Sequence, residues 1–141
     1  MKFLENKIFA RRIDLGLLFL RLSIGLLMLM HGIFKLQYGI DSIAGMVLQA
    51  GLPSFVAYGV YIGEVVAPIL IIAGVATRLT ALFFAINCIV ATFLAHAGDL
   101  FTLNAAGGWA VELLGLYFFG AIALVFTGGG KYAVSSKYIW D

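Results

Sequence analysis

Four long apolar runs take up most of this 141-residue chain and constrain its fold more than any other feature. They cover residues 15–35, 55–77, 79–98 and 109–127. Each is close to the ~20 apolar residues that a helix needs to cross the ~30 Å hydrocarbon core of a bilayer. A water-soluble domain of this composition, 63% hydrophobic and 11% charged, would leave much apolar surface in water. The sequence therefore predicts a membrane protein.

The predicted fold is all-α: a polytopic membrane protein whose four transmembrane helices form an up-down bundle, with a short N-terminal interfacial helix. Backbone groups in hydrocarbon must form their hydrogen bonds within the segment, which favours helices, and short connections make neighbouring helices antiparallel. Residues 2–14 mix apolar and basic side chains at near-helical spacing, which is typical of a helix at the membrane surface. Residues 40–49 predict a second small surface helix, and residues 1–141 form a single domain.

The basic residues predict the orientation of these helices. They precede the first run, separate the second from the third and follow the fourth: Lys2, Lys7, Arg11, Arg12, Arg78, Lys131 and Lys137. The connections 37–54 and 99–108 contain acidic residues instead. Because basic loops stay on the cytoplasmic side, we expect both termini in the cytoplasm. The net charge of +2 is accounted for by this orientation and by contacts of the basic residues with anionic lipid head groups. The expected partner is therefore the lipid bilayer, and no nucleic-acid partner is expected.

Two charged residues, Arg21 and Glu64, fall near the middle of the first two predicted helices. A charge at that depth costs on the order of 3 kcal/mol, so we expect the two side chains to form a central intramembrane pair. The pair is either a structural salt bridge or a site for a proton or a substrate anion. Pro68 is expected to kink the second helix and to free a carbonyl near Glu64. With about 100° per residue, one stripe of the first helix faces the bundle interior: Arg21, Gly25, Met28, Gly32 and Lys35.

Four further polar residues from three helices share one depth near the outer surface. They are His31, Lys35, His96 and Glu112. A quinone headgroup needs donors to its carbonyl oxygens and a base for the proton of the quinol, and these side chains supply both. Two alternatives remain open: simple polar decoration of the interface, and haem between the two histidines, for which nothing else in the chain argues. No metal site is expected.

Several motifs resemble the DoxX family of small bacterial membrane proteins. The matching strings are MHGIFKL at residues 30–36, GLP at 51–53, GGWAVEL at 107–113 and GGGKY at 128–132. The resemblance implies a four-helix fold in the bacterial plasma membrane. It also implies a link to quinone-dependent redox metabolism, to resistance against oxidative stress and to membrane oxidoreductase complexes.

The leading hypothesis is a plasma-membrane accessory or subunit of quinone-linked redox metabolism or oxidative-stress defence. Quinone is then the expected ligand, and a membrane-bound or soluble oxidoreductase is the expected partner. One alternative is a transporter or permeability factor for a small molecule, which would need no electron donor. Another is a structural membrane anchor for a soluble oxidoreductase. The sequence leaves open whether the chain itself catalyses a reaction and whether it forms a homo-oligomer.

Overall fold

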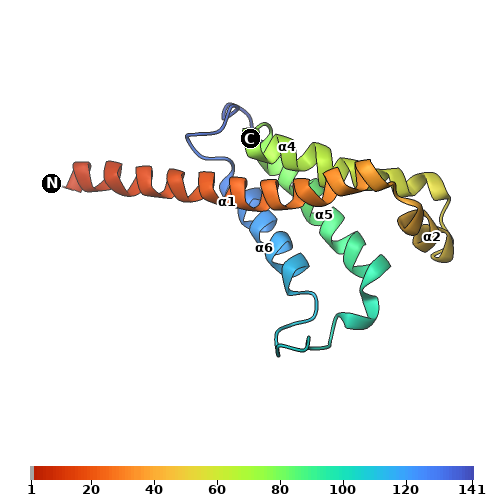
Figure 1. The fold of residues 1–141 in the computed structure, drawn as a ribbon. Helices are drawn as coiled ribbons and strands as arrows, with labels where there is room; N and C mark the ends of the chain where they lie inside the picture. Colours follow the sequence, from red (N-terminus) through yellow and green to blue (C-terminus); the bar gives the residue numbers. More distant parts are fainter. Residues whose placement is uncertain (1) are drawn as a thin grey trace.

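The computed structural model describes residues 2–141, with side chains from residue 12 onward, and every regular element in that range is a helix (Figure 1). In chain order the elements are α1 (Lys2–Tyr38), α2 (Asp41–Gln49), the 3-10 turn η1 (Ser54–Tyr58), α3 (Gly59–Tyr61), the π-helical segment η2 (Ile62–Val66), α4 (Ala67–Ala73), α5 (Thr77–Ala95), the 3-10 turn η3 (Ala97–Asp99) and α6 (Glu112–Thr127). The predicted all-α class and the small helix at residues 40–49 are confirmed.

The N-terminal segment is part of the first long helix. The sequence predicts a separate interfacial helix over residues 2–14, but these residues form the beginning of α1. The physical reason is that this stretch contains no glycine or proline that would end a helix before the apolar run begins.

Three helical segments are long and apolar enough to cross a membrane: Arg12–Tyr38, Ser54–Ala73 and Thr77–Ala95. The second of these consists of η1, α3, η2 and α4, which follow one another without a break. The fourth predicted span is shorter than expected, because α6 has 16 residues and begins at Glu112. The preceding residues form a loop, in which the indole N–H of Trp109 donates to the carbonyl of Leu100 at 2.7 Å.

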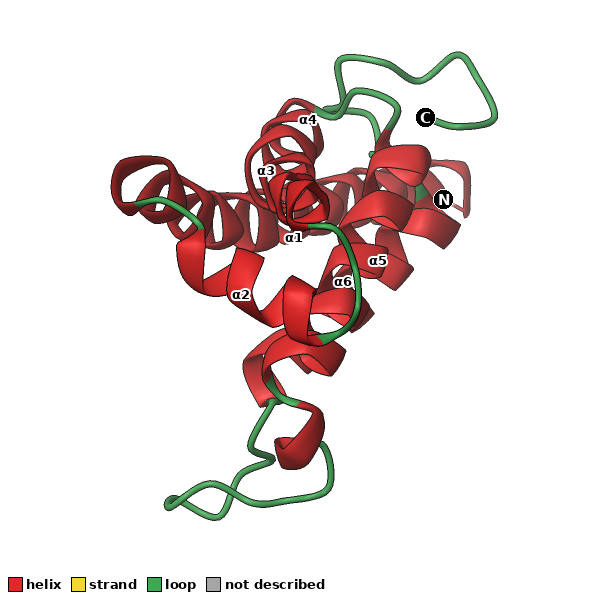
Figure 2. Ribbon diagram, turned by 90° about the vertical axis from the view of Figure 1, so that its right-hand side faces the viewer, coloured by secondary structure: helices red, strands yellow, loops and turns green. Residues whose placement is uncertain are grey.

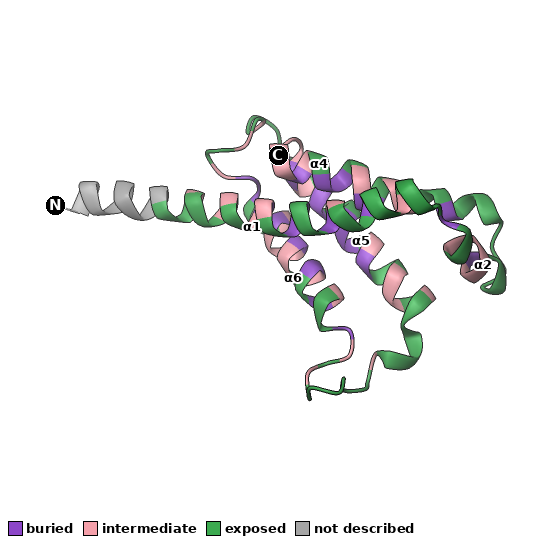
Figure 3. Ribbon diagram, viewed as in Figure 1, coloured by how far each residue is buried: buried purple, intermediate pink, exposed green. Residues whose placement is uncertain are grey.

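The helices pack as two pairs, α1 against η2 and α4, and α5 against α6. The pairs cross where α4 contacts α5 and α1 contacts α6, and the buried core fills this crossing (Figure 3). Its largest buried side chains include Ile24, Met28, Ile71, Phe84, Tyr117 and Leu124. The predicted inward stripe of α1 is confirmed, because its members are buried and Lys35 is half-buried. Beyond the crossing, the C-terminal part of α5 and the N-terminal part of α6 run away from α1 (Figures 1 and 2).

Helix α2 lies beside the end of α1 and closes one side of the angle between the two pairs. It packs on η1 and on α5, and a second small core joins them through Ile40, Val47, Ala57 and Leu94. A hollow therefore remains between α2, η1 and the two helix pairs.

The C-terminal tail, residues 128–141, folds back over the other end of the bundle. The N–H of Val134 donates to the carbonyl of Ala73, the last residue of α4, at 3.1 Å. The carbonyl of Trp140 accepts from the N–H of Arg78 at 3.0 Å and so caps the first turn of α5. The tail thus satisfies backbone groups at the ends of two helices.

Candidate functional site

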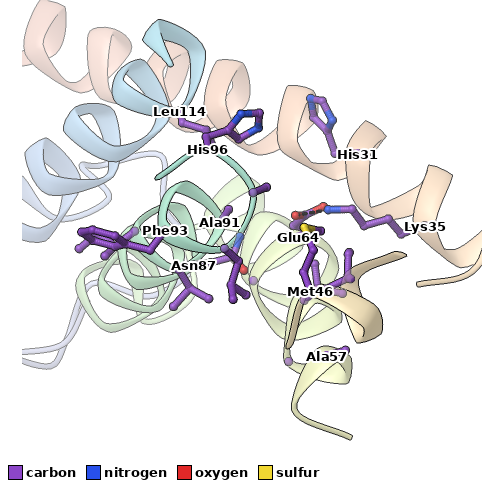
Figure 4. A pocket seen from close by; sticks show the side chains of 18 of the residues that line it. His31, Lys35, Met46, Ala57, Glu64, Asn87, Ala91, Phe93, His96 and Leu114 are labelled. Carbon is purple, nitrogen blue, oxygen red and sulfur yellow. Dashed lines mark hydrogen bonds and ion pairs between the residues drawn. The ribbon is translucent and has the colours of Figure 1, made fainter. Parts of the chain in front are cut away.

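A cavity of about 1050 Å³ occupies the angle between the two helix pairs. Its walls come from α1, α2, η1, η2, α5 and α6, and most of the lining is apolar (Figure 4). Polar side chains in the lining include His31, Lys35, Glu64, Asn87, His96 and Tyr117. A large apolar cavity with a few convergent polar groups is the usual form of a small-molecule site.

An ion pair between Lys35 and Glu64 is the central polar feature of the cavity. The Lys35 ammonium donates to Glu64 Oε1, which joins α1 to the π-helical segment (Figure 4). Glu64 is 5% exposed, whereas the Lys35 side chain keeps 25% of its surface exposed. The second carboxylate oxygen, Glu64 Oε2, has no hydrogen-bond partner among the described residues. The pair therefore leaves one buried acceptor unused.

The local sequence explains why Glu64 lies on a π-helical segment. Pro68 follows Glu64 by four residues and has no N–H to donate to the Glu64 carbonyl, so the regular α-helical pattern cannot continue through it. The helix widens instead, and the N–H of Ala67 bonds to the carbonyl of Ile62. Gly32 of α1 packs directly on this segment, since a Cβ at that position would come within 2.1 Å of the Glu64 carbonyl oxygen. Short π-helical segments of this kind are frequent at functional sites.

The two histidines lie on different walls of the cavity. The His31 ring meets the buried ring of Tyr117 edge-on, with centroids 6.4 Å apart. His96 follows the last residue of α5, and its Nδ1 lies 3.1 Å from a carboxylate oxygen of Asp99 in the adjoining turn. Asn87 of α5 packs against Gly63, where a Cβ would meet the Asn87 amide oxygen at 2.2 Å. The cavity thus has polar groups on α1, η2 and α5.

Glu112 lies outside the lining of this cavity, although the sequence predicts it in the same outer site. It is exposed at the start of α6, and its Oε1 accepts from the Asn104 amide at 3.5 Å. The cause is the late start of α6, which places Glu112 at the loop and not one turn inside a span. Of the four predicted outer residues, the structure brings His31, Lys35 and His96 to one cavity and adds Glu64.

Arg21 does not pair with Glu64, so the predicted central pair is wrong. Arg21 is 1% exposed and lies about 21 Å along α1 from Lys35 at ~1.5 Å per residue. Its Nη1 donates to the carbonyl of Gly129 at 2.7 Å, and its Nη2 donates to those of Ile72 at 3.0 Å and Tyr132 at 3.3 Å. The last carbonyls of a helix lack partners within the helix and carry partial negative charge, which a guanidinium can satisfy.

Sequence reasoning missed the contribution of α2 and of Tyr117 to the cavity. Met46 of α2 and Tyr117 of α6 both line it. The only signal for Tyr117 was a polar atom on an otherwise apolar run, and nothing in the sequence ties α2 to α5. Among the described residues, no three His, Cys, Asp or Glu side chains come together in a way that could hold a metal ion.

Comparison with known proteins identifies relatives over most of the chain. The DoxX family model matches residues 16–97. The Bacillus subtilis "Putative oxidoreductase CatD" is 30% identical over 104 residues, which cover 74% of this chain and 77% of that protein. A Haemophilus influenzae "Uncharacterized protein" is 34% identical over 125 residues, which cover 86% and 90% of the two chains. No solved structure matches the chain.

Proposed function

Because this chain belongs to the DoxX family, we propose that it serves quinone-linked redox metabolism or oxidative-stress defence as a membrane accessory or subunit, with a quinone bound in the cavity. The observation that carries the proposal is the cavity itself: about 1050 Å³, mostly apolar, with one buried ion pair at its wall. A quinone has the matching chemistry, since its ring and isoprenoid tail are apolar and its two carbonyl oxygens accept hydrogen bonds.

The polar residues suit the headgroup of such a molecule. Lys35 has N–H donors beyond the one that binds Glu64, and these can donate to a quinone oxygen. Asn87 and His31 can each donate a hydrogen bond from a different wall. Glu64 and the two histidines are groups that can accept and release protons, which quinone chemistry requires.

The lining also indicates how a lipophilic ligand would enter. Several cavity-lining side chains are exposed, among them Phe34, Ile62, Phe83, Val90 and Phe93. On a helix that crosses a bilayer, such side chains face hydrocarbon. The cavity therefore opens sideways toward the lipid, so that a tail can remain in the bilayer while the headgroup reaches Lys35 and Glu64.

The family and the printed name of one relative support a redox role. The Bacillus subtilis relative carries the words "Putative oxidoreductase". In our proposal the electrons come from an oxidoreductase partner, and this chain supplies the quinone site in the plasma membrane with both termini in the cytoplasm. A reporter fused to either terminus would test that orientation, because a periplasmic signal from either fusion would contradict it.

The binding test uses a variant that fills the cavity without touching the ion pair. Ala91→Trp places a bulky ring in the lining, whereas Leu82, on the same helix, is exposed and lies outside the lining, so Leu82→Trp serves as the matched control. Each protein is purified from native membranes in mild detergent, and its lipid extract is analysed for quinones by mass spectrometry. We expect quinone with the wild type and with Leu82→Trp, and a strong loss with Ala91→Trp. A wild-type protein that neither carries quinone nor binds added quinone would contradict the proposal.

A further inference from the structure

Glu64 presents a buried acceptor that no described residue uses. Oε1 accepts from Lys35, but Oε2 is buried and has no hydrogen-bond partner. An acceptor left unpaired in a low-dielectric site is unfavourable, and this one belongs to a side chain of the cavity wall. Figure 4 shows the carboxylate between Lys35 and the side chains of α5. Because Oε2 is enclosed in this position, a bound molecule can supply the missing donor when the Glu64 side chain turns toward the cavity that it lines.

We infer that Glu64 makes the cavity selective for the reduced, hydroquinone form of its ligand, an inference that rests on the proposed function. A hydroxyl group of the hydroquinone can donate to Glu64 Oε2 and at the same time accept from the Lys35 ammonium. The carbonyl of the oxidised form can only accept. It would satisfy Lys35 but would place its lone pairs against the carboxylate and leave Oε2 unpaired.

The other polar lining groups do not distinguish the two forms. These groups have both donor and acceptor capacity, so either a hydroxyl or a carbonyl can bind them: His31, Ser42, Asn87, His96 and Tyr117. Lys35 donates to both. An ionised carboxylate accepts only, which makes Glu64 the group in this lining whose hydrogen bonding depends on the redox state of the headgroup.

The first experiment compares three forms of one molecule on the wild-type protein. Decylubiquinol, decylubiquinone and the dimethyl ether of decylubiquinol are titrated anaerobically into the detergent-purified full chain by calorimetry. The ether keeps the aromatic ring of the reduced form but carries a methyl group in place of each hydroxyl hydrogen, so it has no hydroxyl to donate. The quinone has nearly the size of the quinol and controls for the added bulk of the ether. We expect the quinol to bind at least about tenfold more tightly than either of the others, which is the effect of one buried hydrogen bond.

The outcomes separate the two proposals. Equal binding of the quinol and its dimethyl ether would overturn the selectivity while leaving the cavity a quinone site. Failure of all three to bind would overturn both.

The second experiment changes the acceptor into a donor. In Glu64→Gln the amide oxygen can still accept from Lys35, and the NH₂ group takes the place of Oε2. We expect this variant to lose the preference for the quinol and to favour the quinone. The control is Glu112→Gln, the same change outside the cavity, which should retain the wild-type preference. An unchanged preference in Glu64→Gln would show that another group selects the ligand.

Discussion

Replacing Arg21 with methionine should release the C-terminal tail, residues 128–141, from the end of the bundle. Methionine fills much of the same buried space but has no donor for the carbonyls that Arg21 binds. Those carbonyls belong to Gly129 and Tyr132 in the tail and to Ile72 in the last turn of α4, so one side chain joins three segments.

The expected loss in the free energy of unfolding follows from the two shorter hydrogen bonds of Arg21, at 2.7 Å to Gly129 and 3.0 Å to Ile72. A bond from a charged donor contributes about 1.5 kcal/mol at the lower end of its range, so the two together contribute about 3 kcal/mol. Removing a buried charge recovers part of its desolvation cost, and a net loss of about 2 kcal/mol in the free energy of unfolding remains. Arg21→Lys should be at least as destabilising, because lysine keeps the buried charge but lacks the planar fork that reaches separate carbonyls.

Thermal unfolding in detergent measures the loss of stability, and hydrogen exchange read by mass spectrometry measures the release of the tail. The amide of Val134, which donates to the carbonyl of Ala73, should exchange much faster in Arg21→Met than in the wild type. Arg12→Met removes an exposed arginine from the same helix and should change neither quantity. If Arg21→Met unfolds at the wild-type temperature with its tail amides still protected, the role that we assign to Arg21 is refuted.

Three further predictions concern the cavity wall and the tail. Gly32→Ala should lower the melting temperature and weaken quinone binding, because the new Cβ would lie 2.1 Å from a backbone oxygen of η2. The control is Gly16→Ala, which has open space around it and should raise the melting temperature slightly. Lys35→Met should lower the free energy of unfolding by about 3 kcal/mol, the lower end of the range for a broken buried pair, because it leaves the Glu64 carboxylate buried and unpaired while Lys35 itself is one-quarter exposed. A double-mutant cycle that also replaces Glu64 with leucine should recover most of this loss. Hydrogen bonds from the Ser135 hydroxyl and from backbone N–H groups lower the pKa of Asp141. The ionised Asp141 carboxylate therefore stabilises the tail above the ordinary aspartate pKa of about 3.9, and this stabilisation is lost as the pH falls through the lowered pKa. The melting temperature measured across this pH range should lose this part of its pH dependence in Asp141→Asn.

The sequence predicts the helices and the inward face of α1 because both depend on patterns within one segment. Apolar runs give the spans, and the spacing of small and polar residues places Gly25, Met28, Gly32 and Lys35 toward the interior. His31, Lys35 and His96 reach one cavity for the same reason, since their depths follow from the helical rise.

The pairing of the charges was not predictable in this way. The sequence shows which side chains carry charge but not which backbone carbonyls a folded tail presents, so Arg21 was assigned the wrong partner. Depth along a regular helix also ignores the widening that Pro68 causes, which brings Glu64 against α1 beside Lys35. Glu112 was misplaced because the start of α6 depends on how the preceding loop folds, and no periodic pattern records that.

Photo-cross-linking with an azido-quinone in native membranes would locate a bound quinone on the chain. We expect the label on peptides that contain residues 31–35 of α1 and 83–95 of α5, and we expect excess unlabelled quinone to suppress it. Label spread over lipid-facing residues outside the cavity, or label that unlabelled quinone does not suppress, would contradict the assignment of this cavity as the quinone site.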